Sequence, residues 1–259
     1  MPDLTPFAWV LLAVAAVVIG LTKAALPGGS TVAVALFAAV LPAKQSTGTI
    51  LLLLIVGDAF ALWAYRRDAD LRTLLRLIPA VIVGLLLGVV FLAFASDDLV
   101  RRAIAVLLLA VVGVTLWRRR RPASVPPAPA AGAPAAPGPR PHRVAAAVYG
   151  SLGGFTTMVA NAAGPVMSMY FLSMRFPVAA FLGTSAWFFA VVNVTKIPFL
   201  VGLGMITPSG LWIVLVLTPV VIAAAFVGRR IARRIPQRLF ERLVIALTVV
   251  GAVYLLLPT

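Results

Sequence analysis

The sequence has no cysteine, a single histidine, and 7 Asp and Glu among its 259 residues. Without cysteine there is no disulfide framework and no thiolate metal site. Charged residues make up 11% of the chain, whereas soluble domains carry about 25%. This composition excludes an ordinary soluble fold.

Apolar segments fill most of the chain instead. The hydrophobic fraction is 62% and the mean hydropathy is +1.09. Membrane spans need about 17 to 25 residues. The segments near or above that length cover residues 7–21, 49–64, 74–95, 99–117, 178–194, 211–227 and 239–257. The first segment has no basic region before it, so we expect it to be retained and not removed as a signal peptide. We predict an all-α, multi-pass membrane protein.

The formal net charge of +15 does not indicate nucleic-acid binding, because no separate basic domain exists to contact phosphates. One stretch differs from the rest: residues 118–143 begin with four arginines and continue as a Pro/Ala/Gly tract. Such a stretch cannot bury enough apolar surface to fold, so we predict a linker that also contains His142. It separates a first membrane unit, residues 1–117, from a second, residues 144–259.

The two units match each other in sequence. At an offset of 135, Gly48 pairs with Gly183 and Asp58 with Asn193, and after an insertion the offset is 140. The further pairs at an offset of 135 are Gly29 with Gly164, Pro42 with Pro177 and Thr49 with Thr184. Those at an offset of 140 are Pro79 with Pro219, Gly88 with Gly228, Leu99 with Leu239 and Arg102 with Arg242. The chain is therefore predicted to be a duplicated unit.

Each unit holds five apolar segments, and an odd number implies that the second copy has the opposite orientation in the membrane. Loop charges agree, because Lys and Arg favour the cytoplasmic side. Placing residues 66–76, the linker, the loop at Arg175 and residues 229–238 inside puts 16 of the 22 Lys and Arg there. We expect two inverted repeats with both termini outside.

The first two segments of each repeat look short or broken. Residues 7–22 are followed by Pro27, Gly28 and Gly29 before residues 30–41, and residues 144–160 are followed by a break at 161–165 before residues 166–174. Paired interruptions in the two halves of a transporter indicate its binding site. A plain turn or a tight helix crossing is the alternative. Gly88, inside a span, is expected to tolerate alanine.

The breaks favour an anion, because a helix start presents unpaired N–H groups and the positive end of the dipole. Glycines there let a ligand approach the backbone. The substrate-binding candidates at the breaks are Lys23, Gly28, Gly29, Ser30, Thr31, Asn161 and Gly164. Thr47, Thr49, Thr184 and Ser185 begin the third segments, where they either line the same cavity or serve capping and packing.

Asp58 is the one carboxylate inside an apolar span, and such a residue is a functional candidate. We interpret it as a proton carrier or site organiser, with an interfacial pair to Arg66 as the alternative. Its repeat mate Asn193 cannot titrate and is a further binding candidate. Lys23 either balances an anionic substrate or snorkels to the interface, whereas Lys196 is expected to snorkel. Tyr65 is interpreted as an interfacial aromatic.

These motifs together resemble the sulfite exporter TauE/SafE family, small bacterial permeases of two related halves. The resemblance rests on residues 23–30, Gly48-Thr49, the segment from Gly57-Asp58 to residues 65–67, residues 153–155, residues 161–165 and residues 183–185. It implies export or uptake of small sulfur-containing or carboxylate anions, such as sulfite or sulfonates, driven by the proton gradient. It also implies a place in the bacterial inner membrane.

Two other classes of protein compete with a transporter. A membrane enzyme needs a nucleophile with a base, or a metal set, and the sequence offers neither. An anion channel or a membrane scaffold is the remaining alternative. The expected partners are a small anion, the lipid bilayer and protons, with no cofactor and no nucleic acid, and a homo-oligomer is compatible with the sequence.

Overall fold

The computed structural model describes residues 4–25, 30–120, 143–173, 176–231 and 237–257. Within these residues the chain forms ten α-helices and one short 3-10 helix, η1. The first half contains α1 (Pro6–Ala25), α2 (Ser30–Val40), α3 (Ala43–Tyr65), η1 (Arg66–Asp68), α4 (Leu71–Phe94) and α5 (Asp97–Arg120). The second contains α6 (Arg143–Ala160), α7 (Ala163–Ser173), α8 (Val178–Gly202), α9 (Pro208–Ile231) and α10 (Gln237–Leu256).

Six of these helices are long and apolar enough to cross a membrane. They are α1, α3, α4, α5, α8 and α9, and many of their large apolar side chains are exposed on the outside of the bundle. Lipid tails are the medium that such a surface requires. The prediction of an all-helical, multi-pass membrane protein is confirmed.

The prediction that the first two segments of each half are short holds for α2, α6 and α7 and is wrong for α1, which is one of the six candidate spans. Helices α2 and α7 have 11 residues each, which at 1.5 Å per residue is about 17 Å. A bilayer core is about 30 Å thick, so neither helix can span it. Helix α6 has 18 residues, and its apolar stretch Val144–Ala160 is not among the six spans, whereas α1 has 20 residues and continues to Ala25, beyond the predicted end at residue 22.

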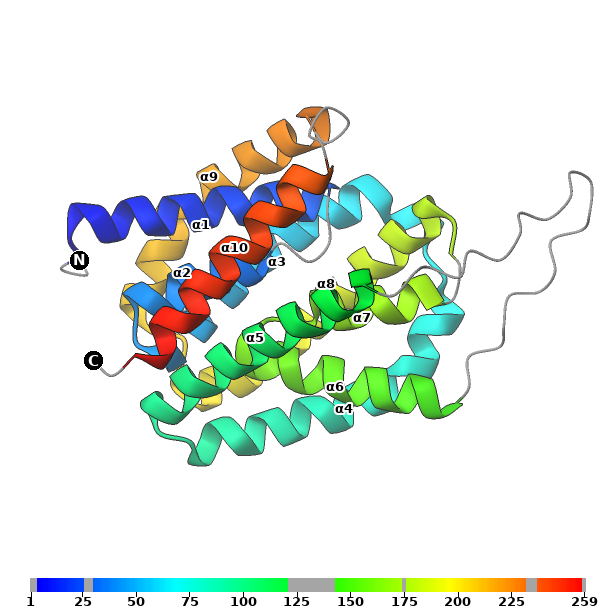
Figure 1. The fold of residues 1–259 in the computed structure, drawn as a ribbon, viewed down its shortest axis with the longest axis horizontal. Coiled ribbons are helices and arrows are strands. Elements are labelled where there is room, and N and C mark those ends of the chain that lie inside the picture. Colours follow the sequence, from blue (N-terminus) through cyan, green and yellow to red (C-terminus); the bar gives the residue numbers. More distant parts are fainter. Residues whose placement is uncertain (1–3, 26–29, 121–142, 174–175, 232–236, 258–259) are drawn as a thin grey trace, which may run out of the picture.

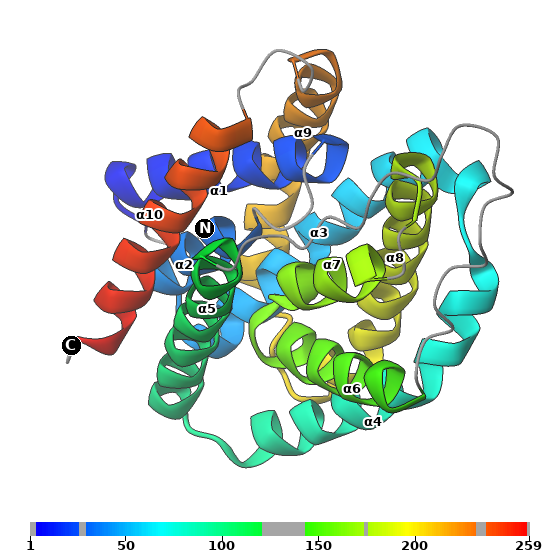
Figure 2. The ribbon, with the colours of Figure 1, turned by 45° about the vertical axis from the view of Figure 1, so that its right-hand side comes forward.

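The helices of the two halves interlock. Helix α1 packs along α9, α6 packs along α4, and α5 packs against α10, while α3 and α8 meet in the centre (Figures 1 and 2). Gly20 lets α1 approach the α9 backbone near Val221, and Gly154 lets α6 approach the α4 backbone near Val81. The expectation for Gly88 is wrong, because a Cβ there would lie 2.6 Å from the Met158 Cβ in the α4–α6 contact.

The predicted linker is shorter at both ends in the structure. Helix α5 continues to Arg120, three residues into residues 118–143, and α6 begins at Arg143. Residues 121–142, with His142, lie outside the described residues.

Candidate functional site

A cavity lies between α3 and α8 in the centre of the molecule. The two helices are antiparallel, because Gly183 near the start of α8 approaches the Tyr65 carbonyl at the end of α3. The cavity has a volume of about 50 Å³, and about 10 to 15 Å³ suffices for one water. It is lined by Thr22, Lys23, Ser30, Leu54, Asp58, Ala61, Tyr65, Thr157, Asn161, Gly164, Leu182, Ser185, Ala186, Phe189 and Asn193.

Both short helices begin at this cavity. Ser30 is the first residue of α2 and Gly164 the second of α7, and both line the cavity. The second break is tighter than predicted: α7 begins at Ala163 and not at Val166, so Gly164 and Pro165 form its first turn. The chain reverses through Asn161, whose φ of 48° is left-handed. Gly28 and Gly29 lie outside the described residues.

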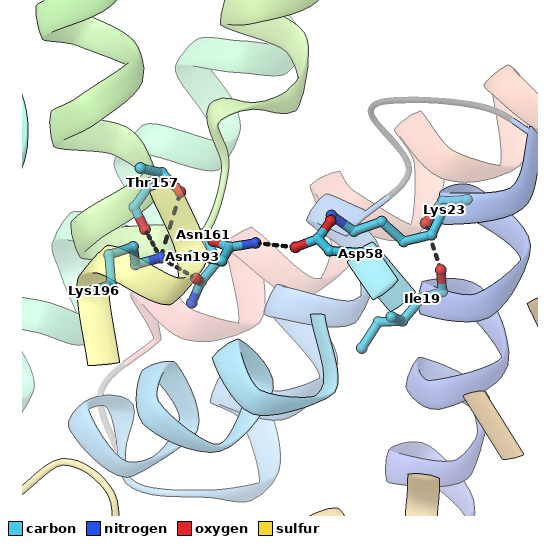
Figure 3. A network of polar contacts seen from close by, with 8 residues as sticks. Ile19, Lys23, Asp58, Thr157, Asn161, Asn193 and Lys196 are labelled. Atoms are coloured by element: carbon cyan, nitrogen blue, oxygen red, sulfur yellow. Dashed lines mark hydrogen bonds and ion pairs between the residues drawn. The ribbon is translucent and has the colours of Figure 1, made fainter. Parts of the chain in front are cut away.

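Asp58 is 2% exposed and accepts two contacts from other helices. Lys23 Nζ on α1 forms an ion pair with Asp58 Oδ1, and Asn193 Nδ2 on α8 donates to Asp58 Oδ2 at 2.7 Å (Figure 3). The alternative of an interfacial pair with Arg66 is therefore wrong. Asp58 lies inside the bundle, as the prediction of a functional carboxylate requires.

The Lys23 side chain packs against α3 at Gly57 and does not snorkel to the membrane interface. Its side chain is 13% exposed, and its Nζ lies 4.6 Å from the centre of the Phe189 ring. Gly57 makes this position available, because a Cβ there would lie 2.8 Å from Lys23 Cγ. The ammonium therefore lines the cavity while it pairs with Asp58.

Lys196 also does not snorkel, contrary to the expectation. It is fully buried, and its Nζ donates to the Thr157 carbonyl at 2.6 Å and to Asn161 Oδ1 at 2.5 Å (Figure 3). Asn161 Nδ2 in turn donates to the Thr47 carbonyl at 3.2 Å. Because α8 continues six residues beyond it, to Gly202, Lys196 lies too far from the helix end to reach the interface.

Three of the predicted binding residues lie away from the cavity lining. Thr31 Oγ1 is 3.0 Å from Thr248 Oγ1 on α10, and Thr49 Oγ1 donates to the Gln45 carbonyl at 2.9 Å. Thr184 Oγ1 accepts from the Asp70 amide at 2.9 Å. The Thr31 and Thr184 hydroxyls therefore connect different elements, whereas the Thr49 hydroxyl bonds within α3. Lys23, Ser30, Asp58, Asn161, Gly164 and Asn193 are brought together at the cavity.

Sequence reasoning missed other residues of the site. Tyr65, expected at the interface, lines the cavity, as do Thr22, Thr157 and Phe189. Thr22 and Thr157 are separated by the repeat offset of 135, and that match was available in the sequence. Phe189 occupies one position of an apolar helix and carried no signal of its own.

The charges at the site favour an anionic ligand. Lys23, Lys196 and Asp58 give this buried region two basic groups and one acidic group. The helix starts at Ser30 and Gly164 add the positive ends of two helix dipoles. Within the described ranges, no group of three or more His, Cys, Asp or Glu is arranged to hold a metal ion.

A multi-pass helical protein with a polar cavity where paired short helices begin has the architecture of a membrane transporter. The family model of the sulfite exporter TauE/SafE matches residues 12–255. The chain therefore belongs to this family, as the sequence motifs had suggested, and a transporter family agrees with the expectation that the chain is not an enzyme. No curated protein and no solved structure matches the chain.

Proposed function

We propose that this protein is a secondary transporter of a small oxyanion, such as sulfite or a sulfonate, across the bacterial inner membrane. One observation carries the proposal: Lys23, Asp58 and the starts of both short helices, at Ser30 and Gly164, meet at one buried cavity. Several weak attractions for an anion coincide there, and each amide or dipole contact contributes about 0.3 to 2 kcal/mol. Together they can offset the dehydration of a small anion.

We further propose that the two halves are inverted repeats, and the reciprocal packing supports this. Gly48 near the start of α3 has no room for a Cβ against Met205, which follows α8. Its repeat mate Gly183 near the start of α8 has no room against the Tyr65 carbonyl at the end of α3 and Ala69 beyond it. The α1–α9 and α6–α4 contacts are related in the same way.

The present cavity lies toward one end of the α3–α8 pair. It extends along α3 from Leu54 to Tyr65 and along α8 from Asn193 back to Leu182. Beyond Tyr65 comes the basic stretch 66–76, which the charge bias assigns to the cytoplasm. On this orientation the cavity faces inward, and both termini lie outside.

Asp58 is the proposed proton carrier because it competes with the substrate for Lys23. When Asp58 is ionised, its carboxylate neutralises the Lys23 ammonium. When Asp58 takes up a proton, the ion pair is lost and the ammonium becomes available to an anion in the same cavity. Proton binding therefore favours anion binding, which couples the anion to the proton gradient.

The test is transport of ³⁵S-labelled sulfite by purified protein in liposomes under anaerobic conditions. We expect accumulation against a sulfite gradient when a pH gradient is imposed, and collapse of the accumulation when a protonophore is added. Equilibration without accumulation would identify a channel. If neither sulfite nor sulfoacetate moved faster than in empty liposomes, the proposed function would be overturned.

A further inference from the structure

Lys196 is a buried cation whose partners are all uncharged. Its Nζ donates to the Thr157 carbonyl, to Thr157 Oγ1 at 3.4 Å and to Asn161 Oδ1. Among the described residues, no carboxylate lies within ion-pair distance of Lys196, and Asp58 is paired with Lys23. A lysine deep in a membrane protein is expensive and is by default a functional candidate. The proposed proton coupling through Asp58 and Lys23 does not involve Lys196.

Lys196 continues the face of α8 that lines the cavity. The lining residues Leu182, Ser185, Phe189 and Asn193 follow one another at helical spacings of three and four residues. The next positions on that face are Lys196 and Leu200, and both are fully buried. The cavity therefore stops at Asn193, with Lys196 one turn beyond it.

On α3, too, the face that lines the cavity continues as a buried face, here toward the start of the helix. The lining ends at Leu54, and the next positions on that face are Leu51 and Thr47, which are 0% and 2% exposed. The Thr47 carbonyl binds Asn161, which binds Lys196. The closed region beyond the Asp58–Asn193 contact thus contains Lys196, whose partners Thr157 and Asn161 also line the open cavity.

The repeat offset relates this closed region to the open cavity. Ala61 lines the cavity, and the residue 135 positions later is Lys196; Tyr65 corresponds in the same way to Leu200. If the two halves exchange conformations when access changes sides, the equivalents of the lining residues line the new cavity. Lys196 would then face it.

We propose that Lys196 is the anion-binding cation of the opposite access state. When the cavity opens toward the ends of the helices where α3 begins and α8 ends, Lys196 lines it and binds the same small oxyanion that Lys23 meets on the other side. This inference rests on the proposed transport function. The anion then has one lysine on each side of the Asp58–Asn193 contact.

The first test measures the KM for ³⁵S-sulfite exchange at each face, in intact cells and in inverted membrane vesicles. In Lys196→Met we expect the KM at the face where α3 begins to rise by about tenfold or more, the effect of losing one charge-assisted hydrogen bond. The KM at the other face should stay within about twofold, since Lys23 serves that side. Thr195→Ala, a neighbouring exposed position on α8, is the matched control.

A merely structural Lys196 gives a different result. Its loss would reduce the amount of folded protein, or the rate at both faces alike, without a one-sided change in KM. Either result would overturn the assignment. Lys196→Arg, which keeps the charge, should recover part of the one-sided affinity.

A second test measures the accessibility of single cysteines to an impermeant reagent and does not change Lys196. The natural chain has no cysteine, so Leu200→Cys and Ala61→Cys each carry a single thiol. During sulfite turnover, an impermeant thiol reagent should modify Leu200→Cys from the face where α3 begins and Ala61→Cys from the opposite face. If Leu200→Cys transports sulfite and never reacts, the inference fails while the transport function stands. If the wild-type protein moves no sulfite, the proposed function fails, and the assignment of Lys196 fails with it.

Discussion

Asp58 and Asn193, which the sequence match pairs at an offset of 135 residues, bind each other directly through a hydrogen bond of 2.7 Å. Their helices, α3 and α8, are the third α-helix of each half and pack against each other in antiparallel orientation. A symmetric pair of carboxylates here would place two negative charges side by side. With Asn at one position, the pair has a single titratable group that accepts a hydrogen bond from its mate.

The first prediction follows from this asymmetry. Asp58→Asn makes the two positions identical, removes the titratable group and keeps the shape of the side chain. We expect the variant to exchange sulfite across liposomes and to lose accumulation driven by a pH gradient. Asp98→Asn, an exposed carboxylate in the first turn of α5, is the matched control. Unchanged driven transport in Asp58→Asn would remove this residue from proton coupling.

The ion pair between Lys23 and Asp58 predicts strong coupling between their mutations. Lys23→Met leaves Asp58 buried without its cation, and breaking a buried pair in this way costs about 3 to 5 kcal/mol. We expect a clearly lower thermal unfolding midpoint in detergent for this variant. The double variant Lys23→Met/Asp58→Asn should recover most of the loss, because no unpaired charge remains. Simple addition of the two single effects would contradict the pairing.

Gly57 is predicted to be needed for the position of Lys23. In Gly57→Ala, the new Cβ would lie 2.8 Å from Lys23 Cγ, so the lysine has to move away from Asp58 and Phe189. Overpacking of this kind costs about 1 to 3 kcal/mol, and we expect sulfite transport to fall. Gly113→Ala is the control, since nothing lies within 4 Å of a Cβ at that helical position. Equal transport by the two variants would show that Lys23 needs no such space.

The sequence predicted those features that depend on local residue types. Several glycine, proline and asparagine residues close together favour a break between helices, so the breaks after α1 and α6 could be found at residues 27–29 and 161–165. A single proline does not suffice, since Pro79, Pro198 and Pro219 lie inside helices. Asp58 was visible as the one carboxylate in an apolar span.

Partners across the bundle could not be predicted, because they depend on which helices meet. Lys23 is 35 residues from Asp58, and Asn161 is 35 residues from Lys196. Nothing in either local sequence indicates these contacts. The sequence pattern places Lys196 near the interface because its apolar stretch ends near Val194, whereas α8 continues to Gly202.

The proposed orientation predicts opposite labelling of two exposed aspartates. Asp68, in η1 at the end of α3, should face the cytoplasm, and Asp98, at the start of α5, should face outward. An impermeant maleimide should label Asp98→Cys in intact cells and Asp68→Cys only after permeabilisation. The two substitutions are chemically identical, so each controls for the other. The reverse pattern would invert the orientation and place the present cavity on the outer side.

The last prediction concerns Gly164, which lines the cavity in the first turn of α7. If the anion contacts the amide groups of this turn, a branched side chain there must occupy the space that the anion needs. We expect Gly164→Val to lose sulfite transport while it still inserts in the membrane and elutes as folded protein. Gly113→Val, at an exposed position of α5 with nothing within 4 Å of a Cβ, should transport normally. Wild-type rates in a folded Gly164→Val protein would mean that the anion does not bind at the start of α7, and the site would then have to rest on Lys23 and the α2 side of the cavity.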